Sequence, residues 1–192
     1  GEEFFTPGYN NYDAWIQYQT YDVTAFLTDQ NQLQVQLGKG WYKGRFGFHG
    51  GTENIYGEDF LLLCELHIDY TDGSHEVITT DDSWQASSSK IGENSIYYGE
   101  DLNDATESFK AYAIKTINGP TDRIKERLSL PVKIKEEIAV QAVLKEEELI
   151  LDMGQNMVGW LKFRNTLAKG VHVKFEFAEI LVNGQFYREN LR

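Results

Sequence analysis

Strict alternation of apolar and polar residues in several short segments is the feature that most limits what this chain can fold into. The alternation is clear in residues 33–37, residues 60–70 and residues 171–177. Successive side chains of a β-strand point to opposite faces, so a period of two predicts strands with one buried face and one solvated face. No segment keeps the 3.6-residue period of a long amphipathic helix. Only residues 22–27 are expected to form a short helical turn, with Asp22 or Thr24 as its cap.

Turn signals between these segments favour short antiparallel strands. The string Thr-Asp-Gly-Ser at residues 71–74 predicts a hairpin that returns through residues 75–80, and Asn183-Gly184 predicts another tight turn. Many short strands separated by Gly, Asn and Asp are typical of a jelly-roll β-sandwich. Residues 87–131 are the least regular stretch and are expected to form long loops and strand crossings. We place a domain boundary near Pro131, beyond which new strands are expected.

Composition excludes several classes of function. The 192 residues have a formal net charge of −12, and so acidic a chain repels nucleic-acid phosphates and anionic lipid. No apolar run approaches the roughly 20 residues of a membrane span, and the first residues show no signal-peptide pattern. We therefore expect no nucleic-acid partner and no membrane partner, and the compartment stays open. The single cysteine, Cys64, excludes an internal disulfide and is predicted to be a small buried apolar residue.

Two groups of local strings stand out along the chain. The first group is residues 6–12, 17–24, 37–48 and 54–57, and the second is residues 152–160, 178–181, 183–184 and 187–192. The first group resembles the amino-terminal domain of bacterial α-L-rhamnosidases of glycoside hydrolase family 78, and the second resembles the concanavalin-like domain that follows it. The strings occur in the order found in that family and are spread over most of the chain. Tyr9 stands where the family usually has Trp, and of a Gly-Glu-Thr-Tyr-Asp-Ala-Arg-like family string only Gly99-Glu100 is clearly kept.

The resemblance implies a fold and a division into domains. Residues 1–131 would form an all-β, galactose-binding-like jelly-roll, an antiparallel β-sandwich whose first strands lie before Gly1. Residues 132–192 would supply extra strands from the start of an adjoining concanavalin-like sandwich that continues beyond Arg192. In the family, a catalytic (α/α)6 toroid follows these domains.

The resemblance also implies a function. The parent protein would be an inverting α-L-rhamnosidase, a glycoside hydrolase that removes terminal α-L-rhamnose, and the acid and base of such an enzyme would lie on the toroid. We therefore name no catalytic residue in this chain and expect the fragment itself to be inactive. We expect it to support the catalytic domain; the alternative is an autonomous Ca²⁺-dependent rhamnose-binding or carbohydrate-binding module. The implied partners are rhamnose-containing glycosides or polysaccharides and the catalytic domain of the same parent chain.

Sugar recognition needs aromatic rings for the apolar face of a pyranose, and amides or carboxylates for its hydroxyl groups. Trp41, which follows Gly40, is the first candidate ring, with packing at a sandwich edge as the alternative. Residues 9–13 and 50–59 have the right polar and aromatic mixture, with an Asx turn and a solvated acidic loop as the alternatives. Ca²⁺ would need loop oxygens. The candidate carbohydrate-binding residues are Tyr9, Asn10, Asn11, Trp41, Asn54, Tyr98 and Glu100, and the candidate Ca²⁺ ligands are Glu53, Asp59 and Asp101.

Overall fold

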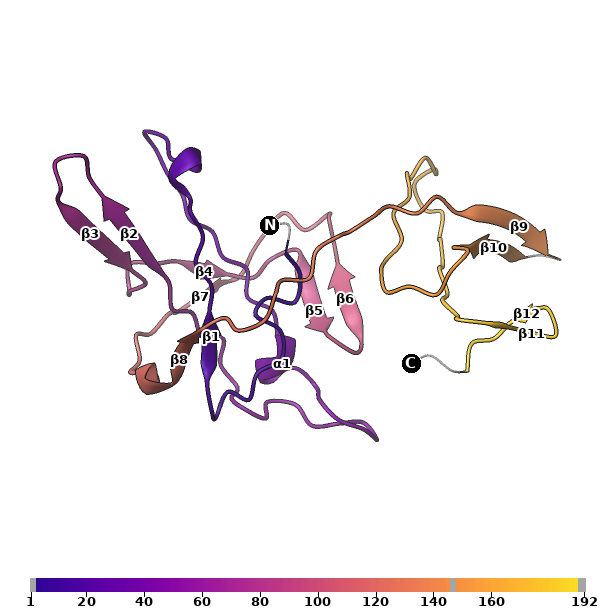
Figure 1. Ribbon diagram of the computed structural model, residues 1–192, viewed down its shortest axis with the longest axis horizontal. Coiled ribbons are helices and arrows are strands. Elements are labelled where there is room, and N and C mark those ends of the chain that lie inside the picture. The colour runs from indigo at the N-terminus through magenta and orange to yellow at the C-terminus, as the bar shows by residue number, and fades with distance from the viewer. Residues whose placement is uncertain (1–2, 146–147, 190–192) are drawn as a thin grey trace. The chain divides into compact units, whose positions relative to one another are not determined.

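The computed structural model describes residues 3–145 and 148–189 (Figure 1). The chain divides into two compact units, unit 1 with residues Gly1–Lys133 and unit 2 with residues Ile134–Arg192. Short strands, turns and loops make up almost all of the described residues, which confirms the predicted all-β class. No helix in this part of the chain is long and apolar enough to cross a membrane.

The strands are short in both units. Unit 2 contributes β9 (Gln141–Lys145), β10 (Glu148–Asp152), β11 (Leu181–Val182) and β12 (Gln185–Phe186). Unit 1 contains the other strands and three short helical segments: β1 (Ile16–Tyr18), η1 (Thr24–Phe26), α1 (Gly40–Lys43), β2 (Glu65–Asp69), β3 (His75–Thr79), β4 (Ala86–Ser87), β5 (Ile91–Ser95), β6 (Gly99–Leu102), β7 (Ala111–Tyr112), η2 (Thr121–Arg123) and β8 (Ile124–Glu126).

The described strands pair into two-stranded ladders. The pairs β2–β3, β4–β7, β5–β6, β9–β10 and β11–β12 are antiparallel, whereas β1 and β8 are parallel, with Ile16 opposite Ile124. Side chains reinforce the β1–β8 pair, because the Leu128 amide donates to Gln17 Oε1 at 2.8 Å. The pairing therefore joins the beginning of unit 1 to its end.

The predicted hairpin at residues 71–74 is confirmed by the β2–β3 pair. The Gly73 amide donates to the Tyr70 carbonyl at 3.0 Å, and Gly73 has a φ of +84° that favours glycine. In β2, Leu66 and Ile68 are half-buried while the odd positions are exposed, as a period of two predicts. The Asn183-Gly184 turn between β11 and β12 is confirmed too: both residues have positive φ, as a two-residue type I′ hairpin requires.

Other local predictions have mixed outcomes. The short turn within residues 22–27 is confirmed as η1, where the Thr24 amide donates to Asp22 Oδ1 at 2.9 Å. Residues 33–37 and 171–177, predicted as strands, form none, because no described segment hydrogen-bonds to them as a neighbouring strand. Cys64 is half-buried rather than fully buried.

Apolar side chains are exposed or half-buried throughout the described residues. None of them is fully buried there, and the solvent-accessible surface is 16948 Å². The reason is the pairing pattern, since a two-stranded ladder has two unpaired edges and no second sheet to cover its apolar face.

Candidate functional site

Six aromatic rings of unit 1 contact one another, and we call them the aromatic cluster: Tyr9, Tyr12, Trp41, Tyr42, Phe46 and Tyr56. Tyr9 stacks on Phe46, with ring centroids 5.5 Å apart and planes 5° from parallel. Trp41, on α1, meets both rings edge-on, at 5.7 Å from Tyr9 and 5.9 Å from Phe46. The indole of Trp41 is thus half-buried among rings, which matches the packing alternative more closely than a freely presented side chain.

The three remaining tyrosines form the second half of the aromatic cluster. Tyr12 meets Tyr42 at 5.2 Å and Tyr56 at 5.1 Å, and Tyr42 and Tyr56 are stacked at 6.4 Å. The hydroxyl groups of Tyr9 and Tyr56 lie 3.4 Å apart and connect the two halves. This hydrogen bond is the main reason that the pKa of Tyr56 is raised to about 12.

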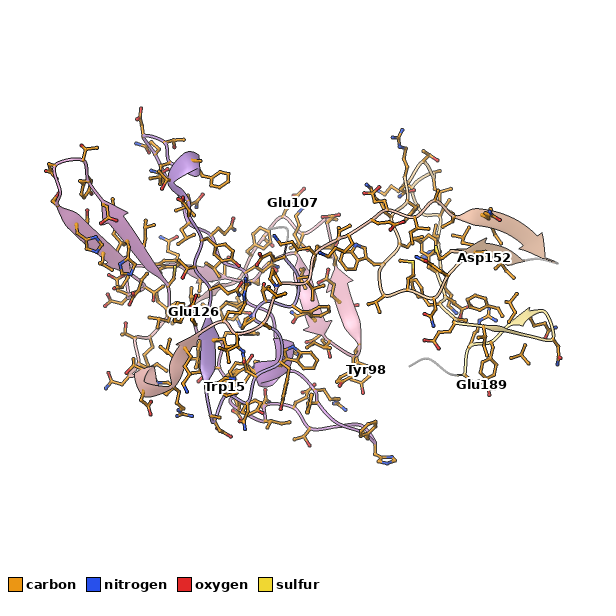
Figure 2. All side chains as sticks on the ribbon, viewed as in Figure 1. Trp15, Tyr98, Glu107, Glu126, Asp152 and Glu189 are labelled. Atoms are coloured by element: carbon orange, nitrogen blue, oxygen red, sulfur yellow. The ribbon has the colours of Figure 1, made fainter. Side chains whose placement is uncertain are left out.

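Asn10 lies beside the aromatic cluster and is only 1% exposed. Its Oδ1 accepts hydrogen bonds from Trp15 Nε1 at 3.1 Å and from the Gln17 side-chain amide; Figure 2 labels Trp15 beside β1. Asn10 Nδ2 has no hydrogen bond of ordinary geometry. The side chain of Asn10 lowers the pKa of Tyr12 and so opposes the larger rise that burial causes. A buried donor without a full partner is costly, so Asn10 is the polar group here that gains most from an added acceptor.

Backbone contacts hold the segments that bear these rings. Arg123 Nη1 donates to the carbonyl oxygens of Tyr12 and Asp13 at 3.1 and 3.2 Å, which ties residues 9–13 to η2. The Asn54 amide donates to the Lys43 carbonyl at 3.0 Å. The bonds of Arg123 join two segments distant in the sequence, and the bond from Asn54 joins the loop that bears Tyr56 to the end of α1.

Asn11 and Asn54 shape the backbone of their loops, and their part in sugar binding stays a prediction. Asn11 Oδ1 accepts from the Asp13 amide at 3.1 Å, which is the Asx turn given as the alternative for this loop. Asn54 adopts a φ of +59°, a left-handed conformation that asparagine tolerates better than most residues. The hydrogen bond from the backbone N–H of Asn54 to the carbonyl of Lys43 places Tyr56 close to α1.

Arg45 connects two other candidate residues to this region. Its guanidinium lies 5.4 Å from the ring centre of Tyr98, a residue in the turn between β5 and β6 (Figure 2). Arg45 Nε is 3.6 Å from Glu53 Oε1. Tyr98 and Glu53 are therefore joined through a residue that the sequence did not single out.

The remaining candidates lie on exposed positions. Asp59 is exposed in a loop, and Glu100 and Asp101 are exposed on β6. In the described residues, no group of three or more His, Cys, Asp or Glu side chains could hold a metal ion. The Ca²⁺ ligand set of Glu53, Asp59 and Asp101 stays a prediction.

The structure brings together candidates that the sequence could name and neighbours that it could not. Tyr9, Asn10 and Trp41 lie in or beside one cluster. Tyr56 belongs to the candidate loop of residues 50–59 but was not named individually, and Phe46 was not proposed as part of a site. The signal that could have found them is the density of rings in residues 41–56. Density alone does not say which rings meet.

Comparisons with known proteins agree on one family. Residues 1–136 match the family model "Alpha-L-rhamnosidase N-terminal domain", and residues 142–192 match "Bacterial alpha-L-rhamnosidase concanavalin-like domain". The chain is 32% identical to an alpha-L-rhamnosidase of Streptomyces avermitilis, over 100% of this chain and 20% of the relative. It is 31% identical to an alpha-L-rhamnosidase of an Alteromonas species, over 97% of this chain and 22% of the relative.

A solved structure gives the same result. The crystal structure of native alpha-L-rhamnosidase from Aspergillus terreus matches with a TM-score of 0.68 and 30% identity, over 83% of this chain and 20% of that chain. The fold and the matches define an all-β region of the glycoside hydrolase class. More particularly, the chain belongs to the bacterial α-L-rhamnosidase family. It spans about a fifth of the length of the relatives that it matches.

Proposed function

We propose that this chain is a non-catalytic supporting region of an inverting α-L-rhamnosidase, which would remove terminal α-L-rhamnose from glycosides or polysaccharides. The names of the relatives support the activity of the parent protein. Their length supports a supporting role for this chain and a catalytic role for another domain, because about four fifths of each relative lies outside the match. On this proposal the catalytic acid and base lie in an (α/α)6 domain of the parent chain. We also propose a jelly-roll domain over residues 1–131 and a concanavalin-like domain over residues 132–192.

The observation that supports this function most strongly is the open apolar surface. Phe26 is 80% exposed, Leu130 is 92% exposed and Val158 is fully exposed. No apolar side chain is fully buried in the described residues, and burying apolar surface stabilises by about 25 cal/mol per Å². Side chains of this kind are suited to packing against other protein surface. We infer that the parent chain, including its catalytic domain, supplies that surface.

The test combines activity with binding. The purified chain is incubated with a nitrophenyl α-L-rhamnoside, and we expect no nitrophenol. The chain is then mixed with the part of the Streptomyces avermitilis relative that lies outside the match, and light scattering after gel filtration is expected to show a one-to-one complex. Nitrophenol released by the chain alone, or absence of a complex, would overturn the proposal.

A matched pair of variants checks which surface is used. Val158→Asp adds a charge and removes an apolar side chain that is fully exposed. Asn156→Asp adds the same charge two residues away, at a position that is also exposed, without removing apolar surface. We expect Val158→Asp to weaken the complex and Asn156→Asp to leave it unchanged. Equal effects would mean that charge, rather than apolar packing, decides the association.

A specific observation favours rhamnose recognition at the aromatic cluster as a second candidate function. Tyr9 is 52% exposed although one of its faces stacks on Phe46. An exposed ring can stack on the apolar face of a sugar. Isothermal titration with L-rhamnose, with and without EDTA, tests this binding and its dependence on Ca²⁺. Tyr9→Ala should abolish the heat and Phe26→Ala should not; no heat at millimolar sugar would remove this candidate.

A further inference from the structure

One face of the β2–β3 hairpin bears two histidines and two carboxylates. Asp69 pairs with His75 and His67 pairs with Val77 in the antiparallel register, so both imidazoles lie on the same face as diagonal neighbours. Diagonal neighbours across a ladder are within reach of ring side chains. The ring centroids of His67 and His75 are 5.6 Å apart, and their side chains are 56% and 47% exposed.

Each imidazole is held by its own carboxylate. His67 Nε2 lies 3.0 Å from Glu65 Oε2, and His75 Nδ1 lies 2.8 Å from Asp69 Oδ1. When the bound nitrogen donates its proton to the carboxylate, the other nitrogen of the same ring becomes the acceptor. Those other atoms are His67 Nδ1 and His75 Nε2. An imidazole oriented by a carboxylate through one nitrogen is the arrangement that proteins use to position metal-binding histidines.

We propose that this face of the hairpin is a binding site for one Zn²⁺ ion, with His67 Nδ1 and His75 Nε2 as ligands and water in the other positions. Zn–N bonds of about 2.0–2.1 Å place two imidazole centres about 5 Å apart on a tetrahedral ion. The observed distance of 5.6 Å between the ring centroids is close to that spacing. Glu65 and Asp69 are positioning residues that act through the imidazoles.

The chemistry of the ligands selects the ion. Imidazole nitrogen suits Zn²⁺ and Cu²⁺, whereas Ca²⁺ and Mg²⁺ prefer oxygen ligands. In the described residues no group of three or more His, Cys, Asp or Glu side chains could hold a metal ion, so the proposed site relies on two imidazoles and water. The rigid turn supports it, because Ser74 donates from its amide and its hydroxyl to Asp72 Oδ1 at 2.8 and 2.6 Å. The site is independent of rhamnosidase activity and of the aromatic cluster.

The test is calorimetric titration of the purified chain with ZnCl₂, and then with CaCl₂ and MgCl₂. We expect one Zn²⁺ per chain at this hairpin, and we expect Ca²⁺ and Mg²⁺ not to displace it. His67→Asn and His75→Asn should each weaken Zn²⁺ binding at least 10-fold, whereas His172→Asn, in unit 2, should leave it unchanged. The proposal is overturned if the double variant His67→Asn/His75→Asn still binds Zn²⁺, or if the unmodified chain does not bind it.

The carboxylates give a second readout. Glu65→Ala should weaken Zn²⁺ binding about 10-fold, the lower end of the effect usual for residues that orient metal ligands. Glu65→Gln should restore most of it, because the amide oxygen can still accept the bond from His67. Circular dichroism of each variant verifies that the strands are retained. Equal Zn²⁺ affinities for Glu65→Ala and the unmodified chain would show that Glu65 does not position His67.

Discussion

Replacing Gly57 by alanine tests how tightly the aromatic cluster is packed. A Cβ atom at Gly57 would lie 2.2 Å from Tyr42 Oη and 2.7 Å from Tyr42 Cζ, whereas unstrained carbon contacts lie at about 3.5–4.0 Å. Either the Tyr42 ring retreats from Tyr12 and Tyr56, or the loop moves and weakens the bond from the Tyr56 amide to the Tyr42 carbonyl. Overpacking of this kind costs about 1–3 kcal/mol. Gly57 does not have a left-handed φ, so the cost is steric.

The assay is urea unfolding followed by tryptophan fluorescence, because Trp41 belongs to the aromatic cluster. We expect Gly57→Ala to lower the free energy of unfolding by about 1–3 kcal/mol and Tm by roughly 2–4 °C for each of those kcal/mol. The matched control is Gly119→Ala, where the added atom meets nothing within 4 Å and φ is not left-handed.

A double variant identifies the partner of the clash. Because Tyr42→Ala removes the ring that the new Cβ would meet, Tyr42→Ala/Gly57→Ala should be as stable as Tyr42→Ala alone. The reasoning is refuted if Gly57→Ala and Gly119→Ala have the same stability. It is also refuted if the cost of Gly57→Ala is undiminished without the Tyr42 ring.

Two titrations test the electrostatics of unit 1. Tyr9→Phe removes the hydrogen bond that raises the pKa of Tyr56 to about 12, so ultraviolet titration of tyrosinate should show one group ionising at lower pH; an unchanged titration curve would contradict the contact. The Arg127 guanidinium holds the pKa of the Glu3 carboxyl below its usual value, so this pair stabilises the fold above the unfolded-state pKa and the contribution is lost as pH falls through the lowered pKa. The difference in free energy of unfolding between the unmodified chain and Arg127→Met, measured with urea, should therefore be larger at pH 7 than at about pH 3. Equal differences at the two pH values would show that Glu3 is not the partner responsible.

Local sequence signals predicted local structure well. Residues 71–74 and Asn183-Gly184 contain everything that a hairpin turn needs, namely a residue that tolerates positive φ and alternating flanks, and both turns are confirmed. Alternation in residues 33–37 and 171–177 was less informative, because it indicates a two-faced segment and not the presence of a neighbouring strand. A ladder needs both.

Long-range pairing could not be predicted from patterns. Nothing in residues 16–18 indicates that they pair with residues 124–126, or that the pairing is parallel. The candidate site shows the same limit. Glycine next to Trp41 suggested a presented ring, but the contacts of Trp41 with Tyr9 and Phe46 depend on three loops meeting. Periodicity and turn signals predicted the all-β class, and the family resemblance added the division into two domains.

The parallel pairing of β1 with β8 has a consequence for the newly made chain. Synthesis runs from the amino terminus, so residues 16–18 leave the ribosome long before residues 124–126 exist to receive their hydrogen bonds. The hairpins β2–β3 and β5–β6 join segments close in sequence and can form at once. Unit 1 can therefore complete the β1–β8 pair only after β8, which follows η2, has left the ribosome.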